Sequence, residues 1–193
     1  MTADATTDIR TEPRIAPLEP PYAPETEAVL KKLMPPGVDP LALFRTLAVH
    51  TELASRMHPL GSGILNHGLL EPREREVVIH RTCARCGAEY EWGVHVVAFA
   101  RPLGFSDAQI AATTQDGVDQ SAWSEREALL VRLADELYAT NTLSDELWAA
   151  LTERWREDQL LEMIVTAGWY RLISYVINAC RVQLEPWAER FPT

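Results

Sequence analysis

The segment at residues 76–95, EVVIHRTCARCGAEYEWGVH, combines the side chains that decide this fold with most of those that could carry out chemistry. It holds three carboxylates, two histidines, two cysteines, a tyrosine and a tryptophan. Gly87 divides it into two stretches whose apolar residues recur at helical spacing. Helix-like apolar sequence also flanks it on both sides. The segment therefore predicts two consecutive helices in a sheltered place.

The composition is that of a soluble globular domain, and it narrows the classes of partner. The chain has 193 residues, 47% of them hydrophobic and 24% charged, which is enough to bury a sizeable core. Its formal net charge is -10, and no cluster of Lys and Arg opposes that charge. Because a phosphate backbone or an anionic membrane is bound through such clusters, neither nucleic acid nor membrane is expected as a partner.

The N-terminal sequence and the cysteines bear on where the protein works. MTADATTDIRTEPRIAP has no apolar run of a signal sequence, and no later stretch reaches the roughly 18 uninterrupted apolar residues of a membrane span. The three cysteines, Cys83, Cys86 and Cys180, are too few for the disulfide scaffold of a secreted protein. These features predict a cytoplasmic protein.

Residues 1–38 are predicted to form a proline-rich arm, and residues 39–193 a helical domain. Residues 1–40 contain 8 of the 13 prolines, which interrupt both helices and sheet pairing. Within the arm, residues 25–34 have a short amphipathic pattern, so the arm could wrap its own domain or a neighbouring subunit. For residues 1–20 a disordered tail is an equal alternative.

Cap signals and apolar spacing predict an all-α domain of about eight helices. Asp39 and Pro40 have the pattern of a cap and first residue for a helix reaching Met57, after which Pro59 and the glycines at 61 and 63 should break the chain. The other expected helices cover residues 73–83, residues 88–101, a segment after the Ser124–Glu127 capping box, a segment after Ser144, and residues 158–184. The sequence has no period-2 strand and no glycine-rich phosphate loop.

The two helices of the opening segment carry ionisable side chains on single faces. In the first helix, Glu76, His80 and Cys83 stand at i, i+4 and i+7. In the second, Glu91 and His95 stand at i and i+4. If the helices form an antiparallel hairpin about the glycine between them, Glu76 and His95 can meet. A carboxylate sharing a proton with a histidine in a low-dielectric cleft is what general acid/base catalysis needs.

Each of these side chains also has a purely structural interpretation. His95 could be a core histidine whose ring nitrogens are satisfied by Glu91 or Glu76. His80 could be a partly exposed helix residue, and Glu91 could simply interact favourably with the dipole at the start of its helix. The aromatic side chains that could line a pocket for a flat or unsaturated substrate, or could instead fill the core, are Trp92, Tyr90 and Trp169.

The cysteine motif at residues 83–86, CARC, allows a redox interpretation. A thiolate made acidic by Arg85 or by the following helix start could attack a peroxide or a disulfide. Buried cysteines at a helix end are the alternative. A zinc site from Cys83, Cys86, His80 and His95 is also conceivable, although the sequence has no second cysteine pair to support it.

The same segment resembles the carboxymuconolactone decarboxylase family, which includes the alkylhydroperoxidase D proteins. That family places a glutamate nineteen positions before a histidine, and Glu76 and His95 match this spacing. The sequence Tyr90-Glu91-Trp92, followed after two residues by His95, is similar to the decarboxylase-type members. The resemblance extends over most of the chain, but only these residues are specific to the family.

The resemblance implies both a fold and a site. The fold is an alkylhydroperoxidase D-like all-helical domain, assembled as a homo-oligomer that is commonly a trimer or a hexamer. In the peroxidase-type members the two cysteines occupy the positions of Ala88 and Glu91, so the cysteines of this chain are out of register, and Tyr90 stands where a relay histidine is often found. The candidate catalytic residues are Glu76, His95, Tyr90, Glu91, Cys83 and Cys86, and the candidate pocket residues are His80, Trp92 and Arg73.

Three functions follow as alternatives. The first is a decarboxylase or related lyase or isomerase that acts on a small unsaturated lactone or carboxylic acid without metal or organic cofactor, with Glu76 and His95 moving the proton. Because the net charge is negative, an anionic substrate would need a local cation, such as Arg73, Arg81 or Arg85. The second is a thiol peroxidase or disulfide reductase that uses the cysteine pair. The third is a non-enzymatic, ligand-binding or scaffolding member in which the site is only packing, and the lack of a pocket beside Glu76 and His95 would favour it.

Overall fold

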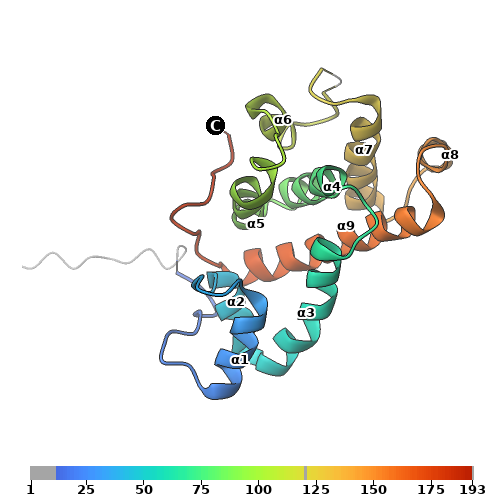
Figure 1. The fold of residues 1–193 in the computed structure, drawn as a ribbon. Helices are drawn as coiled ribbons and strands as arrows, with labels where there is room; N and C mark the ends of the chain where they lie inside the picture. Colours follow the sequence, from blue (N-terminus) through green and yellow to red (C-terminus); the bar gives the residue numbers. More distant parts are fainter. Residues whose placement is uncertain (1–11, 120, 193) are drawn as a thin grey trace, which may run out of the picture.

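The computed structural model describes residues 12–119 and 121–192, and within these ranges all regular structure is helical (Figure 1). This confirms the predicted all-α class, with nine α-helices in the described part where about eight were expected. A 3₁₀ turn at Ala48–His50 and a π-helical turn at Val96–Ala100 join two pairs of helices. The α-helices are α1 Pro24–Leu33, α2 Ala42–Leu47, α3 Thr51–Asn66, α4 Pro72–Arg85, α5 Glu89–His95, α6 Asp107–Ala112, α7 Glu125–Thr140, α8 Asp145–Thr152 and α9 Glu157–Cys180.

Helix α4 lies at the centre of the core, against α5, α7 and α9. Its Val77, Val78 and Ile79 are all fully buried, because α4 is covered on several sides. Figure 1 shows α9 crossing the middle of the molecule, with α4 and α7 on one side and α1 to α3 on the other. The segment at residues 76–95 is therefore sheltered, as the sequence predicts.

The proline-rich arm wraps its own domain from residue 12 onward. Its α1 packs against α3, and Leu18 N–H donates to the carbonyl of Arg45 at 3.2 Å. Further back, Arg14 N–H donates to the carbonyl of Cys180, at the end of α9, at 2.8 Å. Of residues 1–20, for which a disordered tail was the alternative, residues 1–11 lie outside the described residues.

The predicted helix from Asp39 to Met57 and the break after it are both wrong. The cap of α2 is Leu41, whose backbone is extended, and the helical path then continues through Pro59 as far as Asn66. A proline inside a helix removes one backbone hydrogen bond. Helix α3 tolerates that loss because it packs against α1, α2 and α9, and tertiary packing overrides a local propensity.

Three other helix boundaries differ from the sequence prediction. The helix expected over residues 88–101 is α-helical only to His95, after which the π turn carries the chain on, with Arg101 N–H bonded to the carbonyl of Val96. Helix α6, which begins with a capping box formed by Ser106 and Gln109, was not predicted. The last helix ends at Cys180 rather than near residue 184, because the next residue adopts a left-handed backbone conformation.

The C-terminal segment, residues 181–192, returns from the end of α9 along α5 toward α6 (Figure 1). Glu189 N–H donates to the carbonyl of Gly93 at 3.4 Å, and the ring of Phe191 lies 5.1 Å from that of Trp92. Arg190 forms an ion pair with Glu89 at 2.8 Å. This segment, called the C-terminal strap below, covers the outer side of α5.

Helix α9 is the one helix of the described ranges that is long and apolar enough to cross a membrane by length and composition. Its buried residues, including Leu160, Met163 and Tyr170, belong to the hydrophobic core. Buried core helices commonly meet this criterion, so it is weak evidence that α9 crosses a membrane.

Candidate active site

Glu76 on α4 and His95 on α5 form a buried pair, as the hairpin interpretation predicts. The Nδ1 atom of His95 lies 2.8 Å from Oε2 of Glu76, and the two residues expose 3% and 0% of their surfaces. The turn between the helices depends on Gly87, which has a φ of +62°, a conformation that glycine adopts without strain. The predicted contact is confirmed, and the role of the pair in catalysis stays a prediction.

The charges of this pair stabilise one another. Burial alone would lower the pKa of His95, but the charge and hydrogen bond of Glu76, with Glu91 as a second carboxylate, raise it to about 9. Burial would likewise raise the pKa of Glu76, but the charge and hydrogen bond of His95, with the charge of Arg75, lower it. At neutral pH the pair is therefore an imidazolium held by a carboxylate.

Two further side chains surround Glu76. Nε of Arg75 lies 3.4 Å from Oε1 of Glu76, and its NH1 donates to the carbonyl of Leu65 at 3.0 Å. Nδ1 of His80 lies 2.7 Å from the carbonyl oxygen of Glu76, so that nitrogen carries the hydrogen. His80 is 1% exposed, contrary to the expectation of a partly exposed residue, and burial lowers its pKa to about 4. Its neutral ring therefore adds no positive charge to the site.

A cavity of about 1200 Å³ opens beside His95. His95 and Glu91 supply polar groups to its wall, with Nε2 of His95 3.6 Å from Oε1 of Glu91. Because Nδ1 faces Glu76, the ring nitrogen left to meet a bound molecule is Nε2, which also pairs with Glu91. The rest of the wall is mostly apolar and comes from the arm, α2, α3, the π turn and α9, through residues such as Leu33, Phe44, Met57, Phe99, Trp169 and Ile173.

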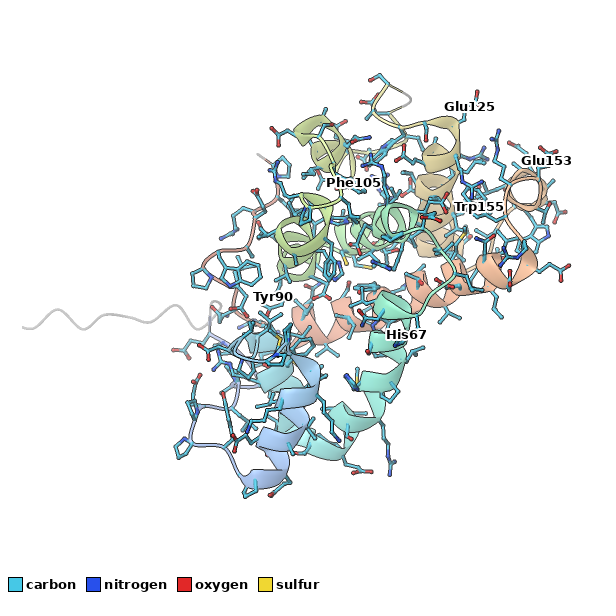
Figure 2. The ribbon with its side chains drawn as sticks, viewed as in Figure 1. His67, Tyr90, Phe105, Glu125, Glu153 and Trp155 are labelled. Atoms are coloured by element: carbon cyan, nitrogen blue, oxygen red, sulfur yellow. The ribbon has the colours of Figure 1, made fainter. Side chains whose placement is uncertain are left out.

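Tyr90 has a different position from the one expected of a catalytic tyrosine. Its hydroxyl donates to Oε1 of Glu185 in the C-terminal strap at 2.7 Å and accepts from the backbone N–H of Leu43 at 3.1 Å. Burial and the hydrogen bond to Glu185 raise its pKa well above the ordinary value. Glu185 also accepts from the backbone N–H of Ala42 at 2.7 Å. Figure 2 places Tyr90 where α5 meets α2, so its hydroxyl ties three segments together rather than facing the cavity.

Glu185 itself lines the cavity and was not among the predicted site residues. The sequence around it, QLEPW, has no periodic pattern that would indicate its contacts. Its hydrogen-bond partner Ala42 is 143 positions away in the chain, so only the folded structure brings the two together.

The two thiols of the cysteine motif lie away from the cavity wall. Cys83 is fully buried, Cys86 is half-buried, and both are free thiols. Burial is the main cause that raises the pKa of each, and for Cys83 nearby carboxylates raise it further. Both thiols are therefore protonated at neutral pH, the opposite of what a nucleophilic thiol needs.

We expect Cys83 to resist thiol reagents in the native protein. Ellman's reagent at pH 7.5 should modify Cys180 and, more slowly, Cys86, whereas Cys83 should react only after denaturation, because its thiol is buried and protonated. Peptide mapping by mass spectrometry identifies the modified residues. Rapid native modification of Cys83 would contradict the structure.

The remaining predicted pocket residues lie outside the cavity wall. Arg73 bonds to Glu127 and to the carbonyl of Leu103, and the indole of Trp92 donates to Thr113 Oγ1 at 2.8 Å. His80 packs behind Glu76, as described above. Among the candidate pocket and catalytic side chains, only Glu91 and His95 reach the wall.

The expectation of a cation from Arg73, Arg81 or Arg85 beside the pocket is wrong. Arg81 is fully buried on the side of α4 that faces α7, where it binds Asp135 and the carbonyl oxygens of residues 113, 115 and 117. Arg85 pairs with Asp116 on that side. Helical spacing places Arg81 and Arg85 away from the face that carries Glu76, whereas Arg73 is held by Glu127. Lys32 and Arg45 are the lysine and arginine of the described ranges that line the cavity.

Within residues 12–119 and 121–192, no group of three or more His, Cys, Asp or Glu side chains has the arrangement of a metal site. The four residues considered for zinc, Cys83, Cys86, His80 and His95, therefore do not form a ligand set. Instead, the imidazole of His95 binds the carboxylate of Glu76.

Solved structures of the same fold are distant from this chain in sequence. A peroxidase-related protein from Silicibacter sp. TM1040 superposes with a TM-score of 0.77 at 13% identity, over 94% of this chain and 97% of that chain. The debrominase Bmp8 superposes with a TM-score of 0.68 at 16% identity, over 90% of this chain and 92% of that chain, both in its apo form and in a variant complexed with 2,3,4-tribromopyrrole. At these identities the likeness shows the fold alone.

Sequence comparison gives a match to one family over part of the chain. None of the curated proteins compared with this chain matches it. The sequence model of the carboxymuconolactone decarboxylase family matches residues 51–136, which begin at α3 and reach into α7. These residues include both members of the buried pair, Glu76 and His95, and the neighbouring Glu91. Over residues 51–136, slightly less than half of its length, the chain is therefore similar to the carboxymuconolactone decarboxylase family.

Proposed function

We propose that this protein is a cofactor-independent acid/base enzyme, a decarboxylase or a related lyase or isomerase that acts on a small unsaturated lactone or carboxylic acid. One observation carries the proposal. Glu76 holds His95 as an imidazolium, and His95 lines a cavity together with Glu91, whose carboxylate pairs with Nε2 of the ring. A proton donor and a proton acceptor are thus adjacent where a substrate can bind.

His95 would act as the general acid. Its Nε2–H would donate the proton to the carbanion or dienolate carbon that remains when carbon dioxide leaves, or to the far carbon of a shifted double bond. Glu76 would keep Nδ1 protonated and would stabilise the positive charge before the transfer. Glu76 does not reach the cavity, so it acts through His95.

Glu91 would act as the general base. Its side chain is within 3.6 Å of His95 Nε2, so one bound substrate could lose a proton to the carboxylate and gain one from the imidazolium. That exchange is an isomerisation. In a decarboxylation the same carboxylate would orient the imidazolium, and the ring would regain a proton from water after the protonated product leaves.

The cavity supports a substrate with one polar end. Most of its wall is apolar, which favours an unsaturated ring or chain. At the His95 end, a carboxyl or carbonyl group would meet one positive and one negative side chain. The debrominase of similar fold was crystallised with 2,3,4-tribromopyrrole, an unsaturated ring. It supports only the expectation that this fold can enclose such a molecule.

The observations do not favour the other two functions. A thiol peroxidase would need an accessible thiolate, whereas burial raises the pKa values of both Cys83 and Cys86. A member in which these residues only pack would need no cavity beside the pair, whereas His95 lines one. A cytoplasmic location and a small-molecule substrate remain part of the proposal.

A proton-exchange experiment tests the proposal without knowledge of the natural substrate. Enolisable unsaturated lactones and ketones, including 4-carboxymuconolactone, are incubated in D₂O, and proton NMR follows both exchange and turnover. We expect wild-type activity to fall by a factor of ten per pH unit above about pH 9, because His95 then loses its proton. Glu91→Gln should lower the rate by about 10² to 10⁴, the usual contribution of a positioned base.

The control variant for charge removal is Glu52→Gln. Glu52 is an exposed residue of α3 that pairs with Arg56, so its replacement should leave the rate unchanged. The Cys83→Ser, Cys86→Ser double variant should also keep the exchange activity. An organic hydroperoxide serves as the opposing substrate, and peroxide consumption that disappears only in the double cysteine variant would show the proposal to be wrong.

A further inference from the structure

Helix α9 carries an apolar stripe on its solvent side, in addition to the face that it buries in the core. Leu161, Val165, Leu172 and Tyr175 expose 64%, 38%, 42% and 59% of their surfaces. Gly168 lies on the same stripe and is exposed too. Successive members are separated by four, three, four and three residues, which is the spacing of a seam between two packed helices.

The opposite face of α9 is the one that packs against the rest of its own chain. Leu160, Met163, Ala167 and Tyr170 belong to the hydrophobic core, and Ile173 belongs to a second apolar cluster. A helix that is apolar on opposite sides is typical of one covered from both sides. Within the described ranges the chain covers only one of them, which leaves the stripe without a partner in this chain.

We infer that the stripe of Leu161, Val165, Gly168, Leu172 and Tyr175 binds the same stripe of a second copy, with the two α9 helices antiparallel about a two-fold axis at Gly168. Leu161 and Tyr175 stand seven residues before and after Gly168, and Val165 and Leu172 stand three before and four after it. A half-turn about Gly168 therefore places each stripe residue opposite an apolar residue of the partner. Such self-complementarity is the requirement of an isologous contact.

Gly168 fits this arrangement and has no explanation within one chain. A Cβ atom at this position would meet nothing within 4 Å, so packing in this chain does not require glycine. In the interior of a helix, glycine costs about 0.5–1 kcal/mol relative to alanine. At the centre of a helix pair, the missing side chain lets two backbones approach closely.

The charges of α9 favour the antiparallel direction. Its N-terminal part carries Glu157, Asp158 and Glu162, and its later part carries Arg171. A parallel pair would place the acidic ends together. Antiparallel helices also oppose their dipoles favourably.

The apolar surface continues beyond the helix. Leu69 is 50% exposed, and its backbone N–H donates to Glu162 beside Leu161. The stripe itself spans 14 residues, or about 21 Å at the rise of an α-helix. In Figure 1, α9 runs through most of the molecule's width, so a partner on this stripe would contact both halves of the fold.

This contact is independent of the proposed function, because no stripe residue lines the cavity. It also discriminates between the two assemblies that the family resemblance implies. A two-fold contact gives an even number of chains, so it is compatible with a dimer or a hexamer, whereas a trimer with only three-fold symmetry lacks it.

Engineered disulfides test the geometry. In a Cys180→Ser background, Gly168→Cys should form a covalent dimer on oxidation with diamide, because the two-fold axis brings the two thiols together. The double variant Leu161→Cys, Tyr175→Cys should also cross-link. Leu161→Cys alone should stay monomeric on a non-reducing gel, since its two copies would lie about 21 Å apart.

The cross-linking results distinguish an antiparallel pair of α9 helices from a parallel pair and from no contact. The background protein, which keeps buried Cys83 and half-buried Cys86, is the control and should give no covalent dimer. Cross-linking of Leu161→Cys alone would show a parallel pair and overturn the proposal. Absence of cross-links in the glycine and double variants alike would overturn it as well.

A second measurement does not depend on oxidation. Leu172→Glu should at least halve the molar mass measured by light scattering after gel filtration, with the circular dichroism spectrum unchanged because Leu172 does not belong to the core. Leu53→Glu is the matched control, since Leu53 is 46% exposed on α3, away from the stripe. An unchanged mass for Leu172→Glu would contradict the contact.

Discussion

Replacing Glu76 by glutamine is expected to remove at least about 99% of the acid/base activity, because a positioned proton-transfer group contributes 10² or more to the rate. Glutamine keeps the size of the side chain and an acceptor oxygen for His95 Nδ1, but it removes the negative charge. Burial would then dominate, and the pKa of His95 would fall below its ordinary value. At neutral pH the ring would no longer be an acid.

The His95 resonance can be followed directly. In the wild type, a ¹³C-labelled histidine spectrum should show one ring that titrates near pH 9, and in Glu76→Gln that titration should move to below about 6.5. This measurement needs no substrate, so it separates the electrostatic role of Glu76 from any error in the proposed reaction. Retention of the high pKa in the variant would show that Glu76 does not hold the charge.

The same change should alter the dependence of stability on pH. The pKa of His95 is raised on folding, so its contribution is complete below about pH 6.5 and is lost as pH rises through 9. The wild-type free energy of unfolding should therefore decline over that interval, measured by urea denaturation. The variant should lack this decline, because its His95 no longer binds the proton more tightly in the folded state.

Glu74→Gln provides a matched control for Glu76→Gln. Glu74 is also a buried carboxylate of α4, but it bonds to Arg126 and to the indole of Trp155, outside the cavity wall. Each variant should lose about 1–3 kcal/mol of stability, the cost of weakening a buried polar contact. Only Glu76→Gln should move the pKa of His95 and the activity.

Replacing Gly93 by alanine should release the C-terminal strap from α5. A Cβ atom at Gly93 would lie 2.0 Å from the carbonyl oxygen of Glu189, a backbone atom that cannot rotate away. Either the strap or α5 has to move, and overpacking of this kind costs about 1–3 kcal/mol. Because Glu185 and Trp187 of the strap line the cavity, activity should fall together with stability.

Gly63→Ala is the matched control for this change. Gly63 lies within α3, where a Cβ atom meets nothing within 4 Å, so alanine should stabilise the helix by about 0.5–1 kcal/mol. Thermal unfolding compares the two variants, and hydrogen exchange measured by mass spectrometry reports on residues 182–192. Wild-type protection of the strap in Gly93→Ala would rule out the predicted displacement.

Local sequence patterns predicted the parts of the fold and site that depend on local contacts. The capping box at Ser124 and Glu127 marked the start of α7, and a hairpin of two helices about Gly87 predicted that Glu76 and His95 meet. Cap residues indicate where a helix begins, and the spacing of its apolar residues indicates which face is buried. The approach of two helices joined by a tight turn can be predicted from these two signals.

The sequence could not predict contacts that join distant segments. Helix α3 passes through Pro59 because α1 and α9 support it, and a proline signal read locally indicates the opposite. His80 was expected to be partly exposed, but Phe105 and Trp92 cover its ring. Glu185 was missed altogether, since nothing near it in sequence relates it to Tyr90.

The hydrogen bond of Tyr90 to the strap joins two parts of the site that have different tasks. One part is the acid/base pair, and the other is the cavity wall opposite it. The acid/base pair stands on α4 and α5 at the core, where a change in either residue disturbs the fold's interior. Much of the wall opposite it comes from residues 19–44 and from Glu185 and Trp187, which lie outside α4, α7 and α9. Mutations there could change which molecules are accepted while the proton-transfer groups stay in place, so the peripheral segments are the place to begin in redesigning substrate range.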